Sequence, residues 1–227
     1  VIPSPICVTM PWRRLRKGEK ELRLLGNLVE PGRVTIDIGA NKGVYSYALS
    51  KLSREVLAFE PNPKMFQILS RSVPANVRTF EIALSNGDGT AELILPVQRS
   101  GRFSNQGVTL QSKKLDGDKE FSVWPVEQRT LDSYDCRDVA FIKIDVEGFE
   151  LEVLEGARET LARERPVMLV EIDAHHAKRP VDDAIGIVRG YGYDCYYVSR
   201  SSLRHYSQFA GDTARTHTDN FIFFPVG

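Results

Sequence analysis

The stretch 34–43, VTIDIGANKG, decides the fold of this chain. Its first five residues are apolar or β-branched except for Asp37, and such a run predicts a buried strand over 34–38. Gly39 and Gly43 predict a tight turn, and the apolar residues that follow predict a helix over 44–52. The residues expected on the inner face of this helix are Val44, Tyr47, Ala48 and Leu52. A strand, a tight turn and a helix in this order begin a βαβ unit, in which the backbone amides at the helix start face a ligand crevice.

Short β-branched runs alternate with segments of helical period along the rest of the chain. The further predicted strands are 55–59, 77–84, 139–146, 167–172, 193–199 and 220–224. Further helices are predicted after the prolines of 61–63, over 149–163 and from Pro180, with Met65, Ile68, Leu69, Leu151, Leu154, Ala157, Leu161, Val181, Ala184, Ile185 and Val188 turned inward. The last two strands lack a crossover helix between them, so they should run antiparallel. The predicted fold class is therefore α/β: a doubly wound, mainly parallel seven-stranded sheet with one antiparallel strand, and ligands at the carboxyl ends of its strands.

Composition divides the chain into an N-terminal extension with a helix at 1–33 and one domain at 34–227. Within the domain, a turn at 86–89 (NGDG) precedes alternating residues at 90–95, which predict a short hairpin arm. The stretch 98–120 is polar and predicts a surface loop or insertion. The stretch 200–219 predicts a second polar loop on the substrate side. Its basic residues, Arg200, Arg204, His205, Arg215 and His217, either attract an anionic group of a substrate or are simply solvated.

Charge and cysteine content exclude several classes of protein. The 30 Lys and Arg balance 30 Asp and Glu, which argues against a strongly basic nucleic-acid-binding surface. No apolar run reaches the roughly 18–20 residues that a membrane span needs, and the first residues lack a secretory core. Cys7, Cys136 and Cys195 are too far apart to predict a disulfide framework or a zinc site. We therefore expect a soluble, cytoplasmic protein.

The first turn and the second strand together predict a nucleoside-containing cofactor. Glu60 follows Gly39 by 21 positions, where an acidic residue can accept hydrogen bonds from both ribose hydroxyls. The dinucleotide fingerprint GxGxxG would require glycine where this chain has Asn41 and Val44. A cofactor without a pyrophosphate is therefore favoured, and S-adenosylmethionine fits. The alternative is that the two glycines only form a tight turn.

Five segments resemble the FkbM family of S-adenosylmethionine-dependent methyltransferases: IDIGANKGVYS, AFEPNP, EIALSNGDGTAEL, FIKIDVEGFELEVLEGA and VMLVEI. The match extends over roughly 34–173. The resemblance implies the class I methyltransferase (Rossmann-like) fold, with S-adenosylhomocysteine as product and Ile82, Ala83 and Leu84 beside adenine. It also implies methylation of a small-molecule acceptor at a hydroxyl group, on a sugar or a natural product; nothing else in the sequence separates O- from N-methylation. The predicted cofactor-binding residues are Asp37, Gly39, Ala40, Asn41, Gly43, Glu60, Ala83 and Asp145.

Charged residues at the ends of two apolar strands predict the acceptor side of the site. Asp145 follows a very apolar run and is expected beside the reacting methyl group, while Glu147 and Glu150 could orient the acceptor or cap the next helix. After the next strand come Glu171, Asp173, His175 and His176, and either histidine could take the hydroxyl proton. The predicted catalytic residues are Asp145, Glu147 and His175. A Mg²⁺ ion held by Asp145, Glu147 and Asp173 is an open but not favoured alternative, so no metal ligands are assigned.

Two other functions stay open on the sequence alone. One is an NAD-dependent oxidoreductase of a nucleotide sugar or alcohol, although GxGxxG and a Tyr-x-x-x-Lys motif are missing. The other is a module that binds an adenosine cofactor without catalysis. Aromatic residues of the last two strands, Tyr196, Tyr197, Phe221 and Phe223, could form a homodimer contact, but a place in the core is favoured.

Overall fold

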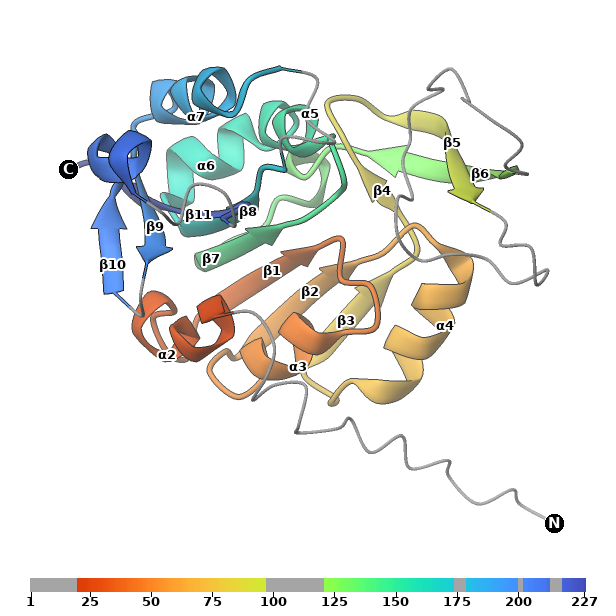
Figure 1. The fold of residues 1–227 in the computed structure, drawn as a ribbon. Coiled ribbons are helices and arrows are strands. Elements are labelled where there is room, and N and C mark those ends of the chain that lie inside the picture. Colours follow the sequence, from red (N-terminus) through yellow and green to blue (C-terminus); the bar gives the residue numbers. More distant parts are fainter. Residues whose placement is uncertain (1–19, 97–120, 174–178, 200–201, 213–217) are drawn as a thin grey trace, which may run out of the picture.

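A computed structural model describes residues 20–96, 121–173, 179–199, 202–212 and 218–227 of the chain, which form two sheets and the helices that cover them (Figure 1). The larger sheet has eight strands in the order β10-β9-β11-β8-β7-β1-β2-β3. Their bounds are β1 Val34–Ile38, β2 Glu55–Phe59, β3 Val77–Phe80, β7 Val139–Ile144, β8 Val167–Glu171, β9 Tyr193–Ser199, β10 Ser202–His205 and β11 Asn220–Pro225. The smaller sheet has the order β4-β6-β5, with β4 Ala83–Leu84, β5 Gly89–Pro96 and β6 Phe121–Arg129.

The larger sheet confirms the predicted fold class. Strands β3, β2, β1, β7 and β8 are parallel neighbours, and β11 runs antiparallel to both β8 and β9. All residues of β1 and β7 are buried, as expected for central strands of a sheet with helices on both faces.

One strand of this sheet was not predicted. Strand β10 pairs antiparallel with β9 inside the stretch 200–219 that the sequence predicted as a loop, so the sheet has eight strands and not seven. The first three of its four residues, Ser202, Leu203 and Arg204, are exposed. The sequence could not reveal it because an exposed edge strand needs no alternation of buried and exposed residues.

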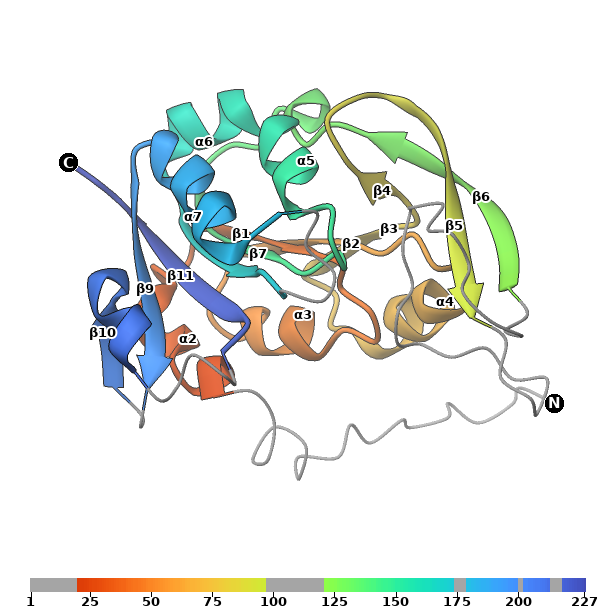
Figure 2. The ribbon, with the colours of Figure 1, turned by 45° about the horizontal axis from the view of Figure 1, so that its top comes forward.

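Helices cover both faces of the larger sheet, as Figures 1 and 2 show from two directions. Helices α2 (Leu25–Leu28), α3 (Val44–Leu49) and α4 (Pro63–Ser72) lie on one face, and α5 (Glu150–Glu155), α6 (Arg158–Glu164) and α7 (Val181–Gly190) lie on the other. Three short 3₁₀ helices complete the described elements: η1 Lys20–Arg23, η2 Asp132–Tyr134 and η3 Tyr206–Gly211. None of the helices in the described part of the chain is long and apolar enough to cross a membrane.

The predicted inner face of α3 is correct only in part, since Ala48 and Leu52 pack against the core but Leu52 lies beyond the helix, which ends at Leu49. The buried residues are Tyr45, Ser46 and Leu49, whereas Val44, Tyr47 and Ala48 are only half-buried. The most buried face of α3 includes a serine, so the spacing of its apolar residues does not mark that face. Ser46 faces inward to donate a hydrogen bond to Asp37 of β1 at 2.5 Å.

The predicted helix over 149–163 is two helices, α5 and α6. The break is at Gly156, where a Cβ atom would lie 2.0 Å from the backbone oxygen of Ser85. Asp132 then caps the second helix, because its carboxylate accepts hydrogen bonds from the amides of Glu159 at 2.9 Å and Thr160 at 2.8 Å. Helix α4 begins as predicted, with Asn62 as its N-cap and Pro63 in its first turn.

The smaller sheet forms an arm beside the larger one (Figure 2). The predicted strand 77–84 is divided between the two sheets, because β3 belongs to the larger sheet and β4 to the arm. The predicted hairpin arm at 90–95 is confirmed by β5, which pairs antiparallel with β6, a strand that was not predicted. The predicted insertion at 98–120 lies outside the described residues. Residues Leu25 and Leu28 of the predicted N-terminal extension pack into the core beside α3 and β2, and the boundary at 33 stays a prediction.

Candidate active site

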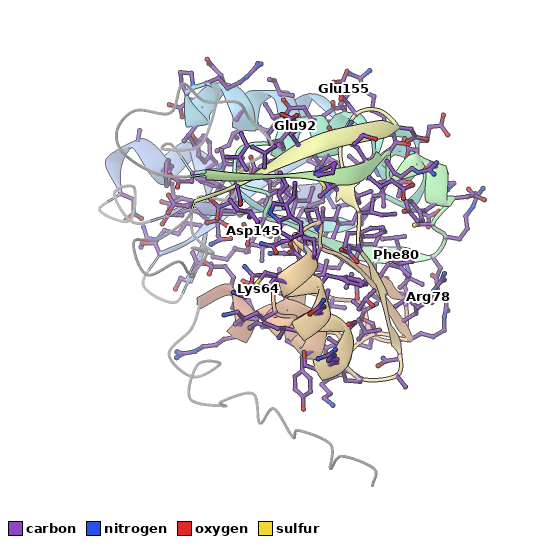
Figure 3. All side chains as sticks on the ribbon, turned by 90° about the vertical axis from the view of Figure 1, so that its right-hand side faces the viewer. Lys64, Arg78, Phe80, Glu92, Asp145 and Glu155 are labelled. Carbon is purple, nitrogen blue, oxygen red and sulfur yellow. The ribbon has the colours of Figure 1, made fainter. Side chains whose placement is uncertain are left out.

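A cavity of about 290 Å³ lies at the carboxyl ends of the parallel strands, close to the size usual for a small-molecule site. Its apolar lining comes mostly from the end of β2, from α4 and from the smaller sheet, with two residues from the ends of β1 and β7: Ile38, Phe59, Pro61, Met65, Ile82, Ala83, Leu84, Leu93 and Val146. Its acidic lining toward β7 and β8 comprises Asp145, Glu147 and Glu171, and Glu60 lies at the end of β2. In the view of Figure 3, Asp145 appears between α4, marked by Lys64, and β5, marked by Glu92. The cavity therefore has a mainly apolar end toward β2 and β4, with Glu60 at its edge, and an acidic end toward β7 and β8.

The turn after β1 brings two strands together at the floor of this cavity. Gly39 has a left-handed backbone with φ of 74°, and a Cβ atom there would lie 1.7 Å from the backbone oxygen of Asp145. The amides of Gly39 and Ala40 donate to the backbone oxygen of Phe59 at 3.0 and 2.9 Å. Only glycine fits at position 39, because a side chain would separate the turn from the end of β7.

Glu60 connects this turn to the start of α4. Its carboxylate accepts hydrogen bonds from the amide of Asn41 at 2.7 Å and the amide of Asn62 at 2.8 Å. The side chain is 7% exposed and lines the cavity. Burial raises the pKa of Glu60 to about 7, although the two amide hydrogen bonds act in the opposite direction. This carboxyl group therefore changes its charge near neutral pH.

Lys143 organises the carboxyl groups behind the cavity. Its Nζ donates to Asp145 Oδ2 at 2.8 Å and to the backbone oxygen of Gly39 at 3.3 Å, and lies 3.9 Å from Asp37 Oδ1. Burial alone would lower the pKa of Lys143, but the carboxylates of Asp145 and Asp37 raise it above its ordinary value. Asp37 itself is completely buried, and burial raises its pKa. The ammonium group thus holds the ends of β1 and β7 and the intervening turn together.

Asp145 also shares a hydrogen bond with the carboxyl group of Glu171. The register explains this contact, because Ile144 pairs with Val170 and the next residues of the two parallel strands lie side by side. Burial tends to raise the pKa of Asp145, but Lys143 and the hydrogen bond from Glu171 lower it below its ordinary value.

Glu147 lies in a strained turn next to this pair. Its backbone is left-handed, with φ of 52°, which is uncommon for a residue with a side chain and is often found at functional sites. The carboxylate of Glu150 supports the turn by accepting from the amides of Gly148 at 2.9 Å and Val146 at 3.3 Å. Glu150 therefore stabilises the turn and the start of α5, which is the structural role that the sequence favoured for it.

The structure brings most of the predicted site residues to one cavity. Those that line it are Gly39, Asn41, Glu60, Ala83, Asp145 and Glu147. Asp37 on β1 and Ala40 and Gly43 in the turn are buried and do not line it. His175 and His176 lie outside the described residues. Glu171 lines the cavity, but the sequence noted only that it ends an apolar strand and gave it no role.

The described residues support neither an anion-binding role for the basic residues of 200–219 nor a magnesium site. Arg204 lies 3.6 Å from a carboxylate oxygen of Asp212, and His205 lies 3.0 Å from one of Asp194, so both basic groups already have acidic neighbours. Arg200, Arg215 and His217 are outside the described ranges. Within those ranges, no three His, Cys, Asp or Glu side chains are grouped so that they could hold a metal ion.

Comparison with known proteins identifies similar sequences and folds. The model of the methyltransferase FkbM domain matches residues 37–195. The hexuronic acid methyltransferase AglP of Haloferax volcanii is 30% identical over 179 residues, which cover 75% of this chain and 69% of that protein. The methyltransferase sdnD of Sordaria araneosa is 27% identical over 156 residues, which cover 55% of this chain and 60% of that protein.

Solved structures share the fold at low sequence identity. A methyltransferase FkbM from Methylobacillus flagellatus superposes with a TM-score of 0.54 at 14% identity over 89% of this chain, which spans only 50% of that protein. SMU.1697c of Streptococcus mutans, solved in complex with SAH, gives a TM-score of 0.51 at 10% identity over 90% of this chain and 94% of that protein. At these identities the likeness shows a common fold.

Proposed function

Because this chain belongs to the FkbM family of methyltransferases, we propose that it transfers the methyl group of S-adenosylmethionine to a hydroxyl group of a sugar or natural product. The observation that carries the proposal is the polarity of the cavity, which is apolar at one end and lined by Asp145, Glu147 and Glu171 at the other. The hexuronic acid methyltransferase among its relatives supports a sugar as the acceptor.

The residues at the apolar end and the first turn suit the nucleoside part of the cofactor. Adenine is flat and largely apolar, and the lining around Ile82, Ala83 and Leu84 matches it. Glu60 has both oxygens directed to backbone amides and still has lone pairs for the two ribose hydroxyls. Gly39 and Asn41 line the cavity beside Glu60 and would contact the rest of the cofactor. We assign Asp37, Ala40 and Gly43 to the support of this turn.

The acidic end suits both the positive charge of the cofactor and a hydroxyl acceptor. S-adenosylmethionine supplies an activated methyl group bound to a positively charged sulfur. Asp145 is kept ionised by Lys143 and can accept a hydrogen bond from the acceptor hydroxyl, while Glu147 and Glu171 offer further acceptor groups. The hydroxyl must lose its proton when it receives the methyl group, and a general base typically contributes about two to four powers of ten in rate. We keep His175 as the predicted base.

The experiment is methyl transfer from radiolabelled S-adenosylmethionine to a panel of neutral glycosides, hexuronic acids and hydroxylated natural products. Treatment of the product with mild alkali separates the two kinds of O-methylation, since a methyl ether survives and a methyl ester is cleaved. We expect an alkali-stable product. The variant Asp145→Asn should bind S-adenosylhomocysteine but transfer methyl groups far more slowly. Label confined to esters or amines would contradict a hydroxyl acceptor, and cofactor binding without any turnover would favour a non-catalytic module.

A further inference from the structure

Three residues of the cavity lining come from the smaller sheet: Ala83 and Leu84 on β4, and Leu93 on β5. Leu93 lies on β5 of the arm and is 2% exposed. It packs in a small apolar cluster with Ala83, Leu95 and Val126, which lies within the smaller sheet. Ala83 also lines the cavity, so the arm and the apolar end share one apolar cluster.

From this placement we propose that the arm formed by β5 and β6 closes the adenine end of the cofactor site, with Leu93 in contact with the base. The inference rests on the proposed function, and it adds a binding residue that the sequence did not suggest. Most of the other apolar lining comes from Phe59, Pro61, Met65 and 82–84, and Leu93 completes a wall around the part of the cavity that fits a purine. Three acidic side chains of the lining come from the ends of β7 and β8, so the end of the cavity next to Leu93 is the more apolar of the two.

The arm holds Leu93 in a fixed position. Strands β5 and β6 pair continuously from Gly89 with Gln128 to Pro96 with Phe121. Two hydrogen bonds fix the base of the arm. Gln128 Nε2 donates to the backbone oxygen of Gly87 at 2.8 Å, and the backbone amide of Ser85 donates to the backbone oxygen of Arg129 at 2.9 Å. A further hydrogen bond of 3.0 Å, from Asn86 Nδ2 to Glu155 Oε2, ties the arm to α5. We therefore expect a preformed wall and not a closing lid.

The test compares two leucines of the same strand. Leu93 and Leu95 are both buried, point to the same face of β5 and pack in the same cluster, but only Leu93 lines the cavity. Calorimetric titration is carried out on the whole chain and on the variants Leu93→Ala and Leu95→Ala. The two ligands are S-adenosylhomocysteine and 5′-methylthioadenosine, which keeps the adenosine but lacks the amino acid. Thermal unfolding of each variant shows that it is folded, and Leu93→Met keeps the volume of the side chain.

We expect Leu93→Ala to weaken both ligands by the same factor of about ten, the effect of losing roughly two buried methylene contacts. Leu95→Ala should change both affinities by less than about twofold, and Leu93→Met should restore most of the binding. Equal losses in the two alanine variants, or a loss of S-adenosylhomocysteine binding alone, would overturn the role of Leu93. Absence of binding to the unaltered chain would instead overturn the proposed function, and this inference with it.

Discussion

The close approach at Gly39 predicts the effect of a single added methyl group. Gly39→Ala would place a Cβ atom 1.7 Å from a backbone oxygen of Asp145, and neither backbone can move without separating β1 from β7. We expect the variant to lose more than about 3 kcal/mol of the free energy of unfolding. Gly32→Ala is the matched control, because Gly32 has nearly the same φ of 78° but nothing within 4 Å of its Cβ position. The control should lose only about 1–2 kcal/mol in urea unfolding, and equal losses would refute the steric argument.

Glu60 predicts that cofactor binding depends on pH. Burial raises the pKa of Glu60 to about 7, so the ligand-free protein binds its proton at pH values where the unfolded chain, with an ordinary value of 4.5, has released it. The contribution of this group to stability is therefore present below about pH 4.5 and is lost as pH rises to about 7. Ribose hydroxyls that donate to the carboxylate favour its ionised form. The affinity for S-adenosylhomocysteine should then rise toward pH 8, by up to about tenfold per unit below the pKa.

Calorimetry in buffers of different ionisation enthalpy measures the proton release that this linkage requires. We expect release of part of one proton per ligand at pH 6.5 and almost none at pH 8.5. Glu60→Gln should bind more weakly and without a change in protonation over this range. A pH-independent affinity in the unaltered chain would show that Glu60 does not face the ribose.

At the scale of single residues, a site residue could be predicted when its position along the chain marks it, and not when its role depends on a neighbour from another strand. Gly39 and Glu60 were found because each ends a strand at a spacing that is visible along the chain. Glu171 received no role because its neighbour Asp145 comes from another strand, and only the register of β7 and β8 brings them together. Asp37 looked like a cavity residue, but Ser46 and Lys143 turn its carboxylate away from the cavity lining.

At the scale of elements, Lys143 is expected to connect β1 and β7. Lys143→Met would leave the buried carboxyl group of Asp37 and the half-buried carboxyl group of Asp145 without their cation, and breaking a buried ion pair in this way costs about 3–5 kcal/mol. Arg54→Met is the control, since the ion pair of Arg54 with Asp138 is exposed and worth at most about 1 kcal/mol. Urea unfolding measures both. The loss at Lys143 should shrink when Asp145→Asn is added, and strict additivity would contradict the proposed coupling.

Helices and strands could be predicted where a pattern of buried apolar residues marks them in the sequence, and were missed where no such pattern exists. Buried parallel strands such as β1 and β7 are continuous apolar runs and were predicted to within two residues. Strand β10 and much of β6 carry exposed side chains, and β6 also contains Pro125, so no apolar alternation marked them. The break between α5 and α6 coincides with the close approach of Gly156 to the backbone of Ser85, a tertiary contact that leaves no periodic signal in the sequence.

At the scale of the whole molecule, the cavity joins the larger sheet to the arm. Its lining comes from β1, β2, β7 and β8 of the larger sheet, from α4, and from the arm through Ala83, Leu84 and Leu93. The arm meets the rest of the fold mainly through its base, where Asn86 bonds to Glu155 of α5. A ligand that fills the cavity would therefore contact the larger sheet and the arm at once.

This arrangement predicts a large effect of the cofactor product on thermal unfolding. A ligand that binds only the folded chain stabilises it by about 2.7 kcal/mol at a concentration one hundred times its Kd. For a chain of this length, that free energy corresponds to a rise in Tm of about 5–10 °C. S-adenosylhomocysteine should give this shift and NADH should give none, because the turn after β1 has Asn41 where a dinucleotide site needs glycine. At the same ligand concentration Glu60→Gln should show a smaller shift, since its Kd is higher. A shift with NADH alone would favour the oxidoreductase over the methyltransferase.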